Sequence, residues 1–177
     1  MHRFLLGLLL VPALAWAQGA GAKRDPMQHF FSPSLGDLQA EAAAARAAGK
    51  QGLCVMYLRD DCPYCERMKA NILSLPAVQA HYRQQFAVLA VDTRGALPMV
   101  DFAGRPATEK DFARAQGVWV TPTVVFYDLD GRPIARVAGE IRTAEEFTLL
   151  GDFVATGAYR TRSFAAYKQS NGNKKGT

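Results

Sequence analysis

The chain has 177 residues, of which 49% are hydrophobic and 21% are charged, and its formal net charge is +5. These values are close to globular averages and predict one domain with a hydrophobic core. The basic residues are scattered and form no dense stripe with interleaved aromatic residues, so a nucleic-acid partner is not expected. An ordinary charged surface accounts for the excess of positive charge.

The first 17 residues have the pattern of a secretory signal peptide. Arg3 belongs to a short positive start, residues 4–14 form an apolar run, and Ala15-Trp16-Ala17 resembles a cleavage site. The apolar run is shorter than the roughly 20 residues that span a bilayer, so no stable membrane insertion is expected after cleavage. An uncleaved anchor is the alternative. We therefore predict export to the periplasm and a flexible segment over residues 18–33.

Hydrophobic periodicity and capping residues predict the elements that follow. We expect helices over residues 35–48, 62–73, 77–85, 108–116 and 143–155, and strands over residues 53–59, 86–91, 124–127 and 132–138. Ser34 is the expected N-cap of the first helix, and Thr143 and Glu146 are expected to form a capping box at the last. Residues 100–105 are expected to form a short hairpin or a loop that turns at Gly104.

This order of elements predicts an α/β fold with a central mixed β-sheet flanked by helices. The domain is expected over residues 34–156, followed by a C-terminal tail over residues 157–177. Tyr159, Phe164 and Tyr167 of the tail are candidates for packing against the domain. From Gln169 onward the tail is expected to be disordered.

Cys62 and Cys65 form a Cys-x-x-Cys motif where a buried strand gives way to a helix. The first turn of a helix has free backbone amides and a partial positive charge, which lower the pKa of a thiol from about 8.5 toward about 3.5–7. The resulting thiolate is the species that attacks a disulfide. Cys65 lies one turn later and can resolve the mixed disulfide. We predict that Cys62 is an exposed nucleophile and that Cys65 is the more buried resolving thiol.

Other interpretations of the cysteines are weaker. A zinc site would need four ligands, whereas His29 and His81 are isolated and Cys54 lies in a strand. A structural disulfide between Cys62 and Cys65 would close too small a loop to stabilise the domain much. Neither a metal nor an organic cofactor is therefore expected. Cys54 is interpreted as a small apolar core residue, with a redox or regulatory thiol as the alternative.

Pro122 directly precedes a predicted buried strand, within the segment Val120-Thr121-Pro122-Thr123. Proline cannot donate a hydrogen bond to a neighbouring strand, so its presence here needs a reason. One explanation is a cis peptide bond that turns the chain beside the cysteines. The sequence by itself leaves the cis and trans forms open.

Three segments together resemble the thioredoxin superfamily, in particular its periplasmic thioredoxin-like members: residues 59–68, 117–123 and 126–131. The resemblance covers residues 35–155. Among subfamilies the chain is most similar to SoxW, the periplasmic thioredoxin of the sulfur-oxidation system. This similarity extends to the tail segment Phe164-Ala165-Ala166-Tyr167. It implies a thioredoxin-like fold with an inserted helical and loop segment before the strand that follows Pro122.

The same resemblance implies roles for the residues around the motif. Pro122 would be the cis-proline opposite Cys62, and the backbone around Thr121 would pair with an extended substrate chain. Pro63 and Tyr64 would support the site from between the cysteines. This dipeptide is the one found in glutaredoxins, although nothing else in the sequence indicates a glutathione site.

The sequence departs from the thioredoxin pattern at two places. Met56 stands where thioredoxins have a buried acid, and Asp60 and Asp61 replace the tryptophan that commonly precedes the motif. Two carboxylates beside Cys62 would oppose a low thiolate pKa unless they serve as helix caps, which is the role we favour. Arg59 and Arg67 are the cations that would offset them.

The resemblance implies a periplasmic thiol–disulfide oxidoreductase that reduces disulfides of protein substrates with electrons from a membrane partner. The sequence lacks the large helical insertion that oxidases of this superfamily carry, which favours the reducing direction. A dithiol oxidase or isomerase is the first alternative. The second is a non-catalytic thioredoxin-fold module that binds peptides.

Overall fold

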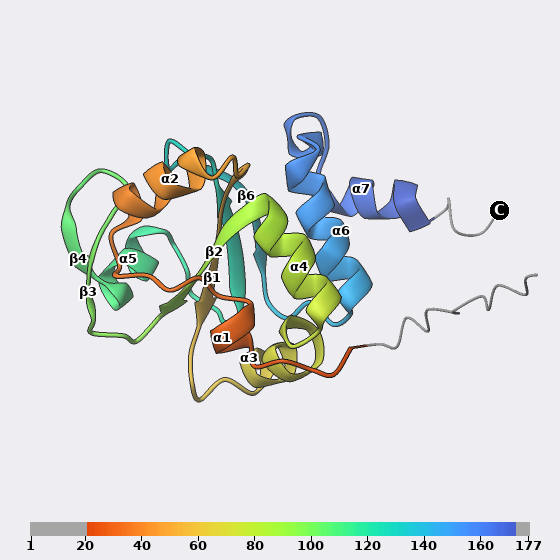
Figure 1. Cartoon of the computed structure of the whole chain (residues 1–177), viewed down its shortest axis with the longest axis horizontal. Coiled ribbons are helices and arrows are strands. Elements are labelled where there is room, and N and C mark those ends of the chain that lie inside the picture. Colours follow the sequence, from red (N-terminus) through yellow and green to blue (C-terminus); the bar gives the residue numbers. More distant parts are fainter. Residues whose placement is uncertain (1–20, 173–177) are drawn as a thin grey trace, which may run out of the picture.

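The computed structural model describes residues 21–172, which form an α/β fold with helices on both faces of a mixed sheet (Figure 1). The predicted signal peptide, residues 1–17, lies outside the described residues, as do residues 18–20 and 173–177. No helix within residues 21–172 is both long and apolar enough to cross a membrane. The predicted fold class is confirmed.

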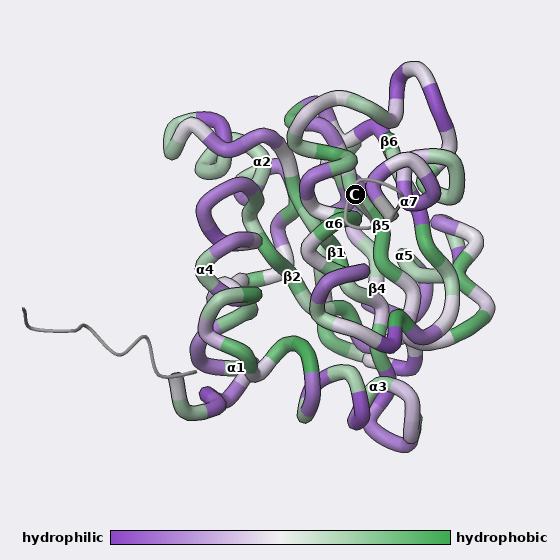
Figure 2. The backbone as a smooth tube through the Cα atoms, turned by 90° about the vertical axis from the view of Figure 1, so that its right-hand side faces the viewer, coloured by the Kyte–Doolittle hydropathy of each residue, from purple (hydrophilic) through white to green (hydrophobic). Residues whose placement is uncertain are grey.

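The main sheet has four strands in the order β2-β1-β5-β6: Phe86–Asp92, Gly52–Leu58, Thr123–Tyr127 and Pro133–Ala138. Strand β1 runs parallel to β2 and antiparallel to β5, and Tyr57 lies opposite Thr123 in the register. Every residue of β1 and β5 is buried, as expected for central strands that are covered on both faces. Hydrophobic residues are concentrated along β1, β2 and β5 (Figure 2).

The two faces of the sheet are covered by different sets of elements. One face carries α1 (Pro26–His29), α3 (Pro63–Met68), α4 (Pro76–Gln85) and α6 (Ala144–Ala155), and the other carries α2 (Leu38–Ala47) and α5 (Glu109–Ala115). Alternate residues of β1 enter opposite cores, so Cys54 and Met56 face the first set while Val55 and Tyr57 face the second. The sheet therefore separates two hydrophobic cores.

The first helix of the domain begins later than the sequence predicts. Asp37, and not Ser34, is the N-cap of α2, and its carboxylate accepts hydrogen bonds from the amides of Gln39 and Ala40, both at 3.0 Å. Gly36 has a φ of 81°, which interrupts any helical backbone before Asp37. The Ser34 hydroxyl instead accepts a hydrogen bond from the Gly36 amide at 3.0 Å.

The middle of the chain agrees more closely with the predictions. The predicted helix at residues 62–73 continues from α3 into a π-helical turn, Lys69–Leu73, before α4 begins. The hairpin interpretation is confirmed, because β3 (Pro98–Val100) and β4 (Pro106–Thr108) pair antiparallel and the turn between them contains Gly104 at a φ of 76°. Thr143 caps α6 by accepting the amide hydrogen of Glu146 at 3.1 Å, but the Glu146 carboxylate accepts from Lys168 at 2.7 Å, so only half of the expected capping box forms.

The segments flanking the domain are more ordered than predicted. Phe30 and Phe31 are 0% and 3% exposed, so the expected flexible segment 18–33 is wrong for its second half. In the tail, α7 (Phe164–Gly172) continues past Gln169, where disorder was expected. The rings of the three tail aromatics lie 5.3–6.5 Å from the ring of Phe153, which confirms their packing on the domain: Tyr159, Phe164 and Tyr167.

Candidate active site

Cys62 lies at the junction between β1 and α3 and is the N-cap residue of α3. Its Sγ atom accepts a hydrogen bond from the Cys65 amide at 3.3 Å, while the thiol donates to the Thr121 carbonyl oxygen at 3.3 Å. Pro63 fits the first helical position because the amide hydrogen it lacks would have no partner there. The sequence around Cys62 thus places its sulfur at the N-terminus of a helix, next to the start of β5.

The two thiols of the motif have opposite pKa shifts. Partial burial opposes ionisation of Cys62, but hydrogen bonds from the Cys65 thiol, from the Thr121 side chain and from the backbone amides of Cys65 and Tyr64 outweigh it, so the pKa of Cys62 is lowered. Burial and then the hydrogen bond to Cys62 raise the pKa of Cys65 to about 11. Cys62 is therefore the thiol that ionises first.

Cys62 is less accessible than the sequence suggests. It is only 3% exposed, against 0% for Cys65, so the prediction of an exposed nucleophile is wrong. The hydrogen bonds to the Cys65 amide and the Thr121 carbonyl draw the sulfur against the protein. Cys62 nevertheless lines a cleft of about 780 Å³, whereas Cys65 does not.

The cleft beside Cys62 has an exposed apolar rim. Tyr64 and Val120 are about half exposed and Trp119 is 79% exposed, and all three line the cleft. The Arg67 guanidinium lies 4.8 Å from the centre of the Tyr64 ring. Phe126 is fully buried in the core and contributes nothing to this surface.

Thr121 and Pro122 occupy the turn that leads into β5. Their peptide bond is cis, and the Pro122 carbonyl accepts a hydrogen bond from the Gly139 amide at 2.8 Å. The Thr123 hydroxyl donates to the Val120 carbonyl at 2.7 Å, which fixes the turn from its other side. Thr121 lines the cleft with Cys62, whereas Pro122 is buried behind it.

The acidic residues before the motif do not cap α3, contrary to our expectation. Asp61 forms ion pairs with Arg59 and, at 2.8 Å, with Arg94, so its carboxylate is directed away from the helix amides. The Cys62 sulfur itself accepts the hydrogen bond from the Cys65 amide that a cap would take. Asp60 is exposed.

The remaining cysteine belongs to the core. Cys54 is 0% exposed and its burial raises the pKa of the thiol far above the ordinary value, which confirms the core interpretation. Met56 is also fully buried, in the same core cluster as Cys65. Within residues 21–172, no three His, Cys, Asp or Glu side chains are grouped as a metal site requires.

The structure thus brings four of the predicted residues into one cleft: Cys62, Pro63, Tyr64 and Thr121. Four arginines also line it, and sequence reasoning singled out only Arg59 among them; it missed Arg94, Arg114 and Arg142. These three lie well after the motif in the chain, and no local pattern links them to Cys62. Trp119 was recognisable as a neighbour of Pro122, but its exposure was not.

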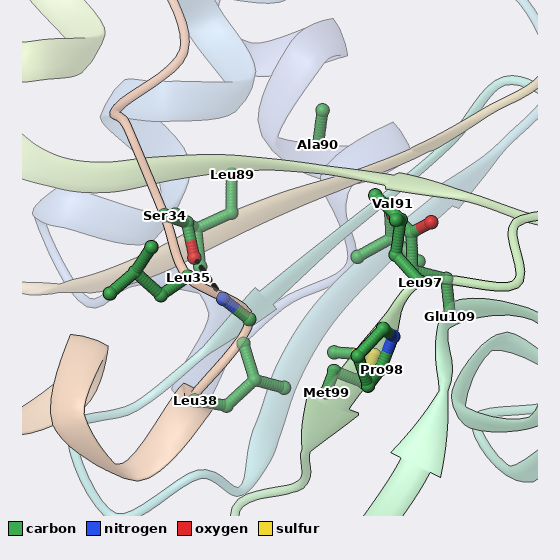
Figure 3. A pocket seen from close by; sticks show the side chains of 11 residues that line it. Ser34, Leu35, Leu38, Leu89, Ala90, Val91, Leu97, Pro98, Met99 and Glu109 are labelled. Carbon is green, nitrogen blue, oxygen red and sulfur yellow. Dashed lines mark hydrogen bonds between the residues drawn. The ribbon is translucent and has the colours of Figure 1, made fainter.

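A second hollow of about 260 Å³ lies at the free edge of β2 and is lined mainly by aliphatic side chains (Figure 3). Leu38, Leu89 and Met99 contribute to it from three different elements, and Glu109 is its one titratable residue. It contains none of the three cysteines.

Comparison with solved structures shows the same architecture. A thioredoxin-fold protein from Helicobacter pylori has 18% identity and a TM-score of 0.64, and the match covers 83% of this chain and 94% of the other. A thioredoxin from Thermus thermophilus has 27% identity and a TM-score of 0.51, covering 65% of this chain and 81% of its own. The reduced C-terminal domain of DsbD from Neisseria meningitidis has 18% identity and a TM-score of 0.49, with coverages of 64% and 89%.

No curated protein matches the sequence. The Thioredoxin-like domain family matches residues 38–155, which is more than half of the chain and includes both the Cys62 motif and the Thr121-Pro122 turn. The structural resemblance to the Helicobacter pylori protein supports the same fold independently of that match. The chain therefore belongs to the thioredoxin-like domain family.

Proposed function

We propose that the protein is a periplasmic thiol–disulfide oxidoreductase that reduces disulfides of protein substrates, with Cys62 as the nucleophile and Cys65 as the resolving thiol. The observation that carries this proposal is the position of Cys62 as the N-cap of α3, with a lowered pKa, next to Cys65 with a raised one. Such a pair holds one sulfur ready to attack and keeps the second protonated until it is needed.

The chemistry needs no group beyond the two thiols and the substrate. The Cys62 thiolate attacks one sulfur of a substrate disulfide, forms a mixed disulfide and releases a substrate thiolate. Cys65 then attacks the Cys62 sulfur, and the proton of Cys65 passes to a departing substrate thiolate. Two electrons move from the protein to the substrate, which leaves as one thiol and one thiolate, and a Cys62–Cys65 disulfide remains. The substrate thiolate takes up from water the proton that Cys62 released when it ionised.

Thr121 contributes through its backbone. Its carbonyl oxygen holds the Cys62 thiol at 3.3 Å in the reduced protein, and its side chain lies in the same cleft. We infer that an extended substrate segment lies along residues 119–121, where its main chain pairs with this backbone as an added strand does. Pro63 and Tyr64 support the site by starting α3 and by forming part of the rim.

The periplasmic location rests on the leader-like residues 1–17. The membrane electron donor is the part of the proposal that follows from the reducing direction, because an exported reductase must itself be supplied with electrons. The thioredoxin from Thermus thermophilus, at 27% identity, supports a thiol–disulfide role in general. The likeness to the SoxW subfamily stays a prediction. Fusing a periplasmic reporter to residues 1–17 and following its export tests the location, because a reporter retained in the cytoplasm would contradict it.

The catalytic roles are tested with serine variants in a disulfide-reduction assay on insulin. Cys62→Ser should reduce activity to the uncatalysed background. Cys65→Ser should accumulate a mixed disulfide that is visible on a non-reducing gel, because the resolving thiol is missing. Cys54→Ser is the matched control and should retain activity. Full activity of Cys62→Ser would refute the proposal.

The direction of electron flow is tested by the reduction potential of the Cys62–Cys65 pair, measured in glutathione buffers. A value near about −270 mV, as in thioredoxin, supports a reductase. A value near about −120 mV would instead assign the protein to dithiol oxidation, since its disulfide would then be a strong oxidant.

A peptide-binding module is the second candidate function, favoured by the exposure of Trp119, Val120 and Tyr64 around the cleft. Apolar side chains left in water at a cleft are typical of a surface that binds a partner. Peptide affinity that is unchanged in the Cys62→Ser/Cys65→Ser variant, together with negligible reductase activity in the wild type, would favour this candidate over the enzyme.

A further inference from the structure

The cleft beside Cys62 carries an excess of positive charge. Four guanidinium groups line it, from Arg59, Arg94, Arg114 and Arg142, and the one carboxylate in the lining is Glu140. If the flanking residues Arg67, Asp60 and Asp61 are included, the cleft and its surroundings contain five guanidinium groups and three carboxylates. We propose that this cleft selects disulfides that lie in acidic segments of a protein substrate, with Arg114 and Arg142 binding carboxylates next to the reacting cysteine.

This inference rests on the proposed function, since the acidic segment is taken to carry the disulfide that Cys62 attacks. It goes beyond that function because it names the chemistry of the substrate and the residues that recognise it. A guanidinium group presents a fixed fork of N–H donors that matches a carboxylate, so an unpartnered arginine in a binding cleft favours an acidic ligand.

Three of the five arginines are already engaged. Arg59 and Arg94 both pair with Asp61, the latter at 2.8 Å. Arg67 holds both oxygens of Glu140, at 2.8 and 3.2 Å. These pairs neutralise Asp61 and Glu140, which leaves Asp60 as the one exposed carboxylate beside the cleft that makes no ion pair within residues 21–172.

Arg114 and Arg142 are the two cleft arginines whose guanidinium groups donate no hydrogen bond within residues 21–172. Arg114 is exposed near the C-terminal end of α5, and its side chain makes no ion pair or hydrogen bond within residues 21–172. Arg142 is 84% exposed, and its distance of 3.8 Å to Glu140 is long for a carboxylate that Arg67 already binds twice. Both side chains remain available to a ligand.

The two free arginines come from different parts of the fold and line one cleft. Arg114 follows the β3–β4 hairpin on one face of the sheet, and Arg142 lies in the loop between β6 and α6. Trp119 and Thr121 line the same cleft with Cys62. A polypeptide segment that fills the cleft therefore meets the apolar rim, the reactive sulfur and both guanidinium groups together.

Overall charge is the competing explanation, because a chain with a net charge of +5 attracts acidic peptides to any part of its surface. Arg160 and Arg162 provide the matched control. Both are exposed and neither lines the cleft. They lie in the segment between α6 and α7, at the opposite end of the molecule from α3 (Figure 1). Replacing this pair removes the same charge as replacing Arg114 and Arg142.

Binding can be measured without any redox step. The sequence contains two tryptophans, Trp16 and Trp119, so the full chain with Trp16→Phe reports on the cleft through the fluorescence of Trp119. The probes are three peptides in which serine replaces the substrate cysteine and the flanking residues are Glu, Gln or Lys. Reduction of a small uncharged disulfide, hydroxyethyl disulfide, is measured in parallel as the test of the proposed function alone.

We expect the Glu peptide to bind about tenfold more tightly than the Gln peptide, and the Lys peptide to bind most weakly. R114Q/R142Q should bring the Glu and Gln affinities within about twofold, whereas R160Q/R162Q should leave the preference in place. Raising the salt to about 0.5 M should weaken the preference, because exposed charges are screened.

Equal binding of the three peptides would overturn the charge selection. So would a preference that survives R114Q/R142Q, or one that R160Q/R162Q removes equally well. A preference that depends on Arg114 and Arg142 in a protein that fails to reduce hydroxyethyl disulfide would support the charge selection and contradict the proposed reductase function.

Discussion

The sulfur of Cys62 accepts the amide hydrogen of Cys65 at 3.3 Å, so the second cysteine of the motif stabilises the ionised form of the first through its backbone. The side chain of Cys65 acts in the same direction, because its thiol also hydrogen-bonds to Cys62. That bond holds the proton on Cys65 and contributes to its raised pKa. The two thiols lie one helical turn apart and therefore differ in pKa and in reactivity.

Alkylation should show this separation as a function of pH. The rate of Cys62 modification by iodoacetamide follows its thiolate fraction, so it should rise with pH with a midpoint below the ordinary thiol pKa of about 8.5. Cys65 should react in a second phase, near its pKa of about 11. Mass spectrometry of the modified peptides measures both. In urea all three cysteines should titrate alike, and a folded-state midpoint for Cys62 at or above 8.5 would contradict the site geometry.

Cys54 should be protected in the folded protein. It is 0% exposed in the middle of β1 and its thiol resists ionisation, so maleimide should label it at least about a hundredfold more slowly than Cys62. Labelling of the reduced protein over time, with the sites identified by peptide mapping, tests this. Equal rates at Cys54 and Cys62 would mean that the central strand opens readily.

Phe30→Ala should destabilise the protein by about 3–5 kcal/mol, because the ring is fully buried and its removal leaves a cavity. The ring lies 5.6 Å from the Tyr82 ring and 6.0 Å from the Phe147 ring, between α4 and α6. Urea unfolding measures the free energy of unfolding. Met27→Ala, at a position that is 56% exposed in the same segment, should stay within about 0.5 kcal/mol. A small effect of Phe30→Ala on the free energy of unfolding would instead support the flexible segment that the sequence predicts over residues 18–33.

Tyr82→Phe should cost about 1 kcal/mol of unfolding free energy. The Tyr82 hydroxyl donates to the Phe147 carbonyl at 2.6 Å, and the two rings stack with centroids 4.2 Å apart, which joins α4 to α6. The variant keeps the stacking and loses only the hydrogen bond. Tyr159→Phe is the control and should change stability by less than about 0.5 kcal/mol. Reductase activity should be preserved in both variants, because neither residue lines the cleft.

Local patterns were sufficient to predict the position of the cysteine pair. A buried apolar strand, a Cys-Pro start and a helix are neighbours in the sequence, and their junction needs no distant contact to form. The N-cap of α2 shows where such patterns become ambiguous. Ser34 and Asp37 are both good capping residues, and the positive φ of Gly36 decides between them.

Features that depend on tertiary packing were not predictable from one sequence. Phe30 and Phe31 lie in a segment without periodicity, and they are buried only because α4 and α6 leave space for them. The charge of the cleft has the same origin, since Arg114 and Arg142 reach it from α5 and from the β6–α6 loop. No spacing rule connects these residues to Cys62.

The pairing of β1 with β5 explains how Cys62 and Thr121 meet although 59 residues separate them in the chain. Tyr57 and Thr123 are opposite each other in adjacent antiparallel strands, so the chain leaves β1 toward Cys62 at the same end of the sheet where it enters β5 from Thr121. The β3–β4 hairpin and α5 lie between them in sequence but take no part in that pairing. Insertions or deletions in this intervening stretch can therefore accumulate during evolution and reshape the surface around the cleft without displacing the reactive sulfur from its carbonyl partner.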